Sequence, residues 1–216
     1  MKYAALILCL LAVTAPSYCA GGNPVDVVRS FLPPRSELAQ LYSFDYKLGR
    51  VTKRWPAVLP AHIMGPTSED IIFAYYSPTI NAVQKTLFIT LLHHAPNGYE
   101  KIYEKSFRSQ VLLAPESLRI FRLQGEPTDA VAVIAGVGAS LGGHLDMLAW
   151  RGIEGWVNIF PPNGGVHYFY FFPKPPELAV ALSRARHPGP AGMPSPEPPP
   201  SWFKWDGHGF APAGGP

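Results

Sequence analysis

The sequence predicts a mainly β protein built from antiparallel hairpin repeats, with few short helices. One observation is a weak threefold repeat, in which an acidic residue precedes an apolar run. These acid-led runs are residues 69–75, 128–134 and 176–182. A second observation is a turn with Gly before an aromatic residue, which follows each run at 97–99, 154–156 and 208–210. The turn glycines lie about 55 residues apart, a period within the range that marks propellers and stacked arrays.

The length and composition are those of a folded globular protein. The 216 residues suffice for one domain with a sizeable core, and 47% hydrophobic against 15% charged residues argues against disorder. The net charge is only +3, and the sequence has no run of Lys and Arg longer than the pair Lys53-Arg54. We therefore expect no nucleic-acid partner.

Residues 1–19 are expected to be a secretory signal peptide. Lys2 starts it, and the apolar core Ala4–Val13 is too short to span a bilayer comfortably. Cleavage after Ser17 or Cys19 predicts a secreted or periplasmic protein with no stable membrane span. Both cysteines, Cys9 and Cys19, lie in or at the edge of this segment, so no internal disulfide is expected. Lipid anchoring through Cys19 is the less favoured alternative.

Residues 20–60 form an N-terminal lead before the repeats. Val25–Leu32 predicts a short helix that Pro33 and Pro34 stop, because proline lacks the backbone donor that a helix needs. Leu41–Tyr46 is apolar and aromatic, which favours a strand.

A β-repeat domain is predicted over residues 61–186. Its strand-like runs are 70–76, 86–92, 99–107, 118–123, 130–135, 145–150, 156–160 and 167–172. The Asn97-Gly98 pair between two runs predicts a hairpin turn, because both residues tolerate positive φ. Residues 177–186 are ambiguous, since their Leu and Ala content favours a helix whereas the repeat favours a strand. Both alternatives stay open, with the strand slightly preferred.

The C-terminal region divides into a linker and a hairpin. Residues 187–200 are dense in Pro and Gly, which is typical of an extended linker. Residues 201–216 contain Trp202, Phe203 and Trp205 before an Asp-Gly turn. Because three large aromatic side chains are costly to leave in water, we expect this hairpin to pack back onto the repeat domain.

The segments that lead into the first two acids are alike, at residues 61–73 and 122–131. This pattern resembles the FG-GAP/VCBS-type repeat of integrin-α-like β-propellers. Residues 150–152 and 205–207 resemble the hairpin that closes each blade of that family. The resemblance covers roughly residues 60–212 and implies a scaffold of β-blades. Three units are too few for a closed propeller, so a partial propeller, a twisted stack or a sandwich-like arrangement is expected.

The calcium sites of that family are not expected in this chain. Family loops that hold calcium use closely spaced Asp and Asn side chains as oxygen ligands. The matching loops, residues 64–68 and 124–128, have at most one acidic residue apiece to offer. We therefore expect no metal and no cofactor, and interpret Asp70 and Asp129 as caps at turns or strand starts.

A serine-nucleophile motif provides the alternative function. Residues 138–142 read Gly-Ala-Ser-Leu-Gly and resemble the nucleophile elbow of α/β-hydrolases, with Ser140 as nucleophile. A triad would need Asp206 and His208, which lie loosely placed in a turn. The elbow requires a helix over residues 143–150, whereas the repeat requires a strand paired with residues 156–160. The alternative is thus a small secreted serine esterase.

The preferred interpretation is a secreted, non-catalytic binding or scaffolding protein. Its partner is expected to be a protein, a peptide or a glycan. Loops 78–84, 136–143 and 161–165 are the candidate ligand contacts, because repeat folds gather variable loops on one face. The side chains singled out in these loops are Thr79, Asn81, Ser140 and Asn163.

Overall fold

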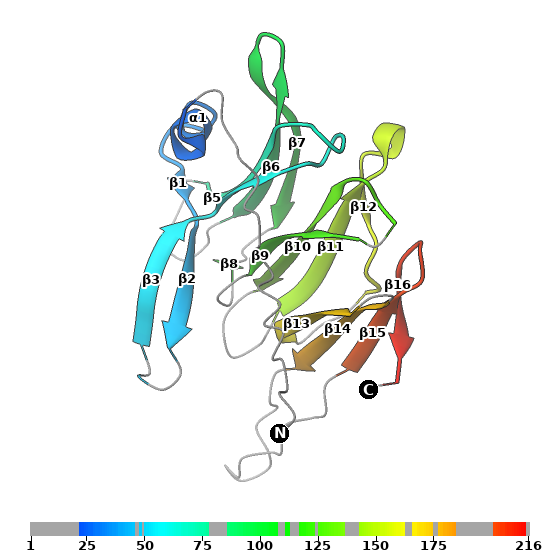
Figure 1. Ribbon diagram of the computed structural model, residues 1–216. Coiled ribbons are helices and arrows are strands. Elements are labelled where there is room, and N and C mark those ends of the chain that lie inside the picture. The colour runs from blue at the N-terminus through cyan, green and yellow to red at the C-terminus, as the bar shows by residue number, and fades with distance from the viewer. Residues whose placement is uncertain are drawn as a thin grey trace, which may run out of the picture.

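The computed structural model describes most of the chain from residue 22 onward. The described residues are 22–45, 48, 50–77, 86–107, 111–112, 117–123, 125–136, 143–162, 166–174, 177–184 and 201–214. Within them the protein is mainly antiparallel β-sheet with one short α-helix (Figure 1), which confirms the predicted fold class.

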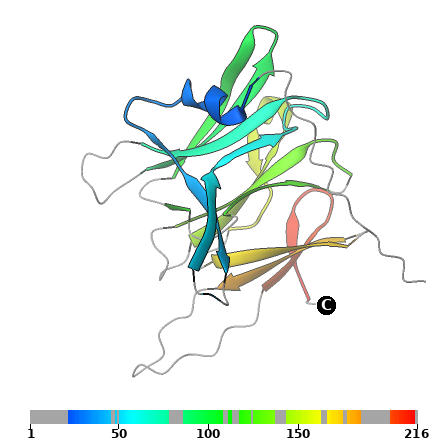
Figure 2. The ribbon, with the colours of Figure 1, turned by 60° about the vertical axis from the view of Figure 1, so that its left-hand side comes forward.

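Twelve of the strands form three consecutive four-stranded units, in which each strand pairs antiparallel with the next along the chain. The first unit contains β4 Val58–Ala61, β5 Asp70–Tyr76, β6 Leu87–Ala95 and β7 Gly98–Phe107. The second contains β9 Leu118–Arg122, β10 Asp129–Gly136, β11 Gly143–Trp150 and β12 Trp156–Asn158. The third contains β13 Val166–Lys174, β14 Glu177–Arg184, β15 Ser201–Trp205 and β16 Phe210–Ala213. Figure 2 shows the three units succeeding one another from top to bottom in chain order.

The threefold sequence repeat coincides with these units. The acid-led runs are the second strand of each unit, namely β5, β10 and β14. The Gly-aromatic turns connect the third strand to the fourth in every unit. Of the ambiguous segment 177–186, the described residues 177–184 are therefore in a strand, β14, which pairs with β13 on one side and β15 on the other.

The glycines in these turns are needed for two different physical reasons. Gly98 and Gly155 have φ values of 112° and 71°, which residues other than glycine rarely adopt. Gly209 has no such φ, but a Cβ placed on it would lie 3.3 Å from the carbonyl oxygen of Ile159. There the glycine lets the C-terminal turn approach the second unit closely enough for Phe210 N–H to donate to Ile159 O at 2.9 Å.

The N-terminal lead contains the helix and more strand than expected. Helix α1, Pro24–Arg29, is capped by Asn23, whose side-chain oxygen accepts from Val25 N–H at 3.1 Å. Strand β1, Glu37–Leu38, pairs with β5 beyond the end of β4. Strands β2, Gln40–Asp45, and β3, Arg50–Pro56, form a two-stranded hairpin, hereafter the arm. Strand β8, Val111–Leu112, pairs with the end of β10, and a 3₁₀ turn spans Gly152–Glu154.

The arm leaves the first unit at a junction of three alanines. Ala39 N–H donates to Ala74 O, Ala57 N–H to Ala39 O, and Ala74 N–H to Ala57 O, at 2.8–2.9 Å. All three residues are fully buried. This closed ring of backbone hydrogen bonds holds the base of the arm firmly while its two strands diverge from the sheet.

The core is layered, with strands β5 and β10 buried on both faces. Between the first two units lie Ile72, Ala74, Val131 and Val133, among others. The outer face of β5 packs against Val28 of α1. Burial on both faces explains why the two runs are continuously apolar rather than alternating.

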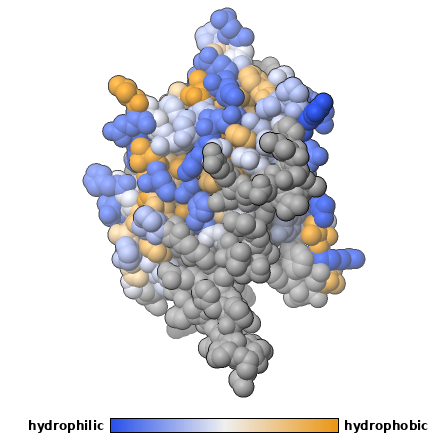
Figure 3. Space-filling view, turned by 180° about the vertical axis from the view of Figure 1, so that it is seen from behind, coloured by the Kyte–Doolittle hydropathy of each residue, from blue (hydrophilic) through white to orange (hydrophobic). Residues whose placement is uncertain are grey.

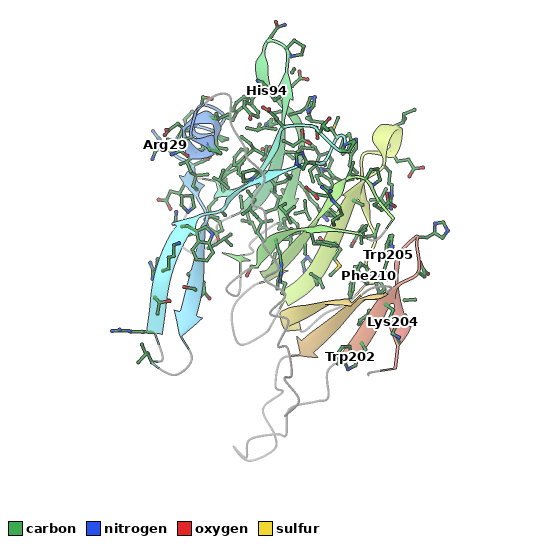
Figure 4. The ribbon with its side chains drawn as sticks, in the orientation of Figure 1. Arg29, His94, Trp202, Lys204, Trp205 and Phe210 are labelled. Carbon is green, nitrogen blue, oxygen red and sulfur yellow. The ribbon has the colours of Figure 1, made fainter. Side chains whose placement is uncertain are left out.

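The C-terminal hairpin covers the far face of β10 and β11. Its Phe203 and Phe210 pack in one cluster with Ala132, Ile134 and Met147 of the second unit. Figure 4 shows Trp205 and Phe210 at the end of the hairpin nearest the second unit, and Trp202 and Lys204 farther along it. The segment after the Pro-rich stretch is thus an integral layer of the fold.

Candidate functional site

An open groove of about 330 Å³ lies where the arm meets the first strands of the first two units. Its walls come from β2 and β3 of the arm, from β4 and from β9. The lining residues are Leu41, Trp55, Leu59, Pro60, Leu118, Arg119 and Ile120. In Figure 1 the arm lies at the left of the molecule, and β9 lies nearer its centre.

Strand register places these side chains together. Leu41 of β2 lies opposite Trp55 of β3, at the end of the arm nearest the alanine junction. Leu118 and Ile120 are two apart on β9 and therefore face the same side of that strand. Leu41 and Leu118 are 2% exposed and form the floor of the groove, whereas Arg119 is exposed.

The groove combines an apolar floor with positive charge. Trp55 is half-buried, and the ammonium of Lys53 lies 5.9 Å from the centre of its ring. This is close enough for a weak cation–π contact. A site of this chemistry suits an apolar or aromatic group next to a negative charge.

Asp70 confirms the interpretation of the repeated acid as a cap. Its side chain is fully buried, and one carboxylate oxygen accepts from Ile63 N–H at 2.7 Å and Met64 N–H at 2.8 Å. Ser68 Oγ donates to the same oxygen, and His93 Nδ1 lies 2.7 Å from the other. The carboxylate therefore organises the loop before β5, and its oxygens are occupied by protein donors.

Asp129 occupies the equivalent position in the second unit but joins two units. Its carboxylate accepts from His62 N–H at 2.8 Å, and its own N–H donates to His62 O at 2.8 Å. The other carboxylate oxygen accepts from Arg122 Nε and Nη2 at 3.0 and 2.9 Å. The repeated acid thus fastens the loop of the first unit to the start of β10.

A polar cluster lies at the seam between β7 and β11. Lys105 Nζ is 2.7 Å from Asp146 Oδ2, and Asn158 Nδ2 donates to Asp146 Oδ1 at 2.9 Å. His144 Nε2 is 3.8 Å from Asp146 Oδ2. Asn158 Oδ1 in turn accepts from the N–H groups of Met147 and Phe160. This cluster ties the first unit to the second, and its members satisfy one another.

The hydrolase alternative requires a helix over residues 143–150, and the structure has a strand there. Residues 143–150 form strand β11, which pairs with β10 and with β12. A nucleophile elbow needs a helix there. Ser140 itself lies outside the described residues.

Asp206 and His208 lie in the exposed turn between β15 and β16. Asp206 Oδ1 accepts from the N–H groups of His208 and Gly209, each at 2.9 Å. The hydrogen bond from Gly209, followed by that from His208, holds the pKa of Asp206 below its ordinary value. In this arrangement Asp206 is a turn cap whose carboxylate binds backbone.

The ligand loops proposed from the sequence lie almost entirely outside the described residues. This holds for Thr79, Asn81, Ser140 and Asn163. The structure instead draws attention to Trp55 and Arg119, which sequence reasoning did not single out. Their signal was weak, because Trp55 ends a polar segment in the lead and Arg119 is one basic residue in an alternating strand.

In the described part of the chain, no group of three or more His, Cys, Asp or Glu side chains could hold a metal ion. Among the helices that the structure describes, none has the length and apolar character needed to cross a membrane. Seen from behind in Figure 3, the described surface intermixes hydrophobic and hydrophilic residues.

No family model matches the chain, and no curated protein matches it significantly.

Proposed function

We propose that this chain is a secreted, non-catalytic β-repeat protein that binds a protein, peptide or glycan through the groove at the base of the arm. The observation that carries the proposal is the groove itself, with its apolar floor and the exposed residue Arg119 at the point where three parts of the fold meet. Binding sites in proteins are typically concave and mostly apolar with a few placed polar groups.

The form of the scaffold supports a binding role. The second strands of the first two units, β5 and β10, are packed into the core, which supports a firm frame around the groove. Rigid frames position recognition surfaces without ordering cost on binding. The proposal that the units are FG-GAP/VCBS-type repeats rests on the residue pattern and on their four-stranded form.

A ligand array tests the binding role. The purified protein would be screened against glycan and peptide arrays beside two variants, Trp55→Ala and Ile120→Ser, which alter the groove. The matched control is Ile153→Ser, because Ile153 is fully exposed on the turn between β11 and β12, outside the groove lining. We expect signals that the groove variants lose and the control retains. Signals that survive both groove variants, or arrays without signals, contradict the proposal.

Two further measurements test export and the absence of catalysis. Mass spectrometry of the exported protein should give a chain that begins at Tyr18 or Ala20. A chain that retains residues 1–17 contradicts secretion by the signal peptide.

Incubation with a fluorophosphonate should leave Ser140 unlabelled. Labelling of Ser140, with ester hydrolysis that Ser140→Ala abolishes, would establish the esterase instead.

A further inference from the structure

The arm is a half-unit with an exposed edge strand. Within the described residues, each repeat unit has four strands, whereas the arm has two, β2 and β3. Among the described strands, β3 pairs with β2 alone, and Figure 1 shows β3 on the outer margin of the molecule. The five consecutive residues 50–54 of β3 are all exposed. Such an edge presents unpaired backbone groups that can accept another strand.

The arm also holds the whole positive surplus of the protein. Residues 40–56 contain four Lys or Arg and one Asp, a surplus of three. The full chain has 18 basic and 15 acidic residues, which is the same surplus, so the remainder is balanced. Like charges on two copies repel, so this edge disfavours pairing with itself and favours an acidic segment.

A β-bulge aligns the positive charges with the groove. The register pairs Leu41 with Trp55, Ser43 with Lys53, and Asp45 with Arg50. The β2 partners are two apart, so Trp55, Lys53 and Arg50 lie on one face of the arm despite their uneven spacing on β3. The irregularity between Ser43 and Phe44 produces this shift, and Thr52 Oγ1 lies 2.8 Å from Ser43 Oγ beside it.

We propose that the edge of β3 accepts an acidic, extended peptide segment of a partner protein as a third strand. Acidic side chains of that segment lie opposite Arg50 and Lys53, and an apolar or aromatic side chain enters the groove beside Trp55. Main-chain pairing supplies affinity and the alternate side chains supply specificity, as in other cases of strand addition. This inference rests on the proposed binding function and specifies its partner.

A fluorescence-anisotropy assay on the full protein tests the proposal. The probe is a labelled eight-residue peptide, Val-Glu-Val-Glu-Val-Glu-Val-Phe, whose Glu side chains and terminal Phe lie on the same face when the peptide is extended. One comparison peptide has Lys in place of Glu, and another has Pro in place of two central Val residues. We expect the acidic peptide to bind, and both comparison peptides to bind at least tenfold more weakly. Equal binding of the Pro peptide would show charge attraction without strand pairing and would overturn the proposal.

Protein variants locate the peptide on the arm. The double variant Arg50→Glu, Lys53→Glu should weaken binding about tenfold or more, because attraction becomes repulsion. The control is Arg29→Glu, which reverses the charge of an exposed arginine on α1, away from the arm, and should change affinity less than twofold. Binding that the double variant leaves unchanged overturns the inference. So does concentration-dependent dimerisation that the double variant abolishes, since the edge would then belong to a second copy.

The array described above separates failure of this inference from failure of the proposed function. Array ligands lost in Ile120→Ser, together with no binding of the acidic peptide, would overturn only the acidic-strand inference. Loss of acidic-peptide binding in both Ile120→Ser and the double variant supports strand and groove acting as one site.

Discussion

Asp70 and Asp129 stand at the same place in two repeats, yet their carboxylates fasten different backbone. Asp70 closes the loop of its own unit, whereas Asp129 joins its unit to His62 of the preceding one. In both cases the acid accepts N–H groups that the β-ladder does not pair. Satisfying these groups near the core is a structural need in itself, because a buried unpaired donor is costly.

Asp70→Asn should therefore destabilise the fold. The amide keeps the shape but loses the charge that strengthens the hydrogen bonds from Ile63, Met64 and Ser68. We expect the free energy of unfolding to fall by about 2–3 kcal/mol in a urea titration. The control is Glu154→Gln on the exposed turn, which should leave stability unchanged. A loss for Asp70→Asn no larger than for this control would refute the capping role.

Tyr75 should make stability depend on pH under alkaline conditions. Burial, together with its hydrogen bond and proximity to the Glu104 carboxylate, raises the pKa of Tyr75 above its ordinary value near 10. The neutral phenol is thus favoured in the folded state. Its contribution to stability is full below pH 10, where the unfolded chain is also neutral, and declines as pH rises further.

Comparison of the wild type with Tyr75→Phe measures this contribution. Guanidinium unfolding at pH 8, 10 and 11 should give a stability difference that narrows above pH 10. A difference that stays constant over this range would show that Tyr75 does not titrate as proposed.

At the scale of the element, one exposed carboxylate caps the turn of the C-terminal hairpin. The pKa of Asp206 is lowered by the N–H groups of Gly209 and His208, so the ionised form is favoured in the closed turn. This stabilisation is present above the pKa of about 3.9 that an unfolded Asp has, and is lost as pH falls through the lower folded value.

We expect local opening of β15–β16 to increase below about pH 4. Hydrogen exchange of the Phe210 amide, corrected for its intrinsic rate, measures this opening. In Asp206→Asn the side chain can still accept hydrogen bonds but does not titrate, so its protection should change less with pH. Parallel pH profiles for the two proteins would argue against this role.

Strand β14 shows how pairing decides an element that local preference leaves open. Its Leu and Ala content favours a helix. Its backbone is instead paired with β13 and β15, which supply ladder hydrogen bonds along both edges. The sequence does not predict strand β3, because its residues are mostly polar and exposed and contain no apolar run.

At the scale of the whole molecule, the layers depend on one another across large distances in sequence. Phe210, 5% exposed, packs 5.4 Å from Phe160 between ring centres, in the cluster that covers the second unit. Removing it should open the face of β10 and β11 that the hairpin covers. The hairpin therefore contributes to the stability of the domain and is not a peripheral addition to it.

Phe210→Ala should lower the free energy of unfolding by about 3–5 kcal/mol, through lost burial and the cavity that remains. Thermal unfolding and binding of an apolar dye would report the loss and the exposed face. The matched control is Trp202→Ala, at the other end of the same hairpin and half-buried. Equal losses for the two variants would contradict a specific role for Phe210 as the anchor.

The repeat, the positions of most strands and the mainly β class follow from the sequence by itself, because apolar runs and Gly-containing turns are local signals. Tertiary structure alone decided the groove, the alanine junction and the inter-unit role of Asp129. These features join residues far apart in the chain, as His62 and Asp129 are at a separation of 67 residues. No local pattern specifies which distant backbone group a side chain will meet, since sheet packing determines that choice.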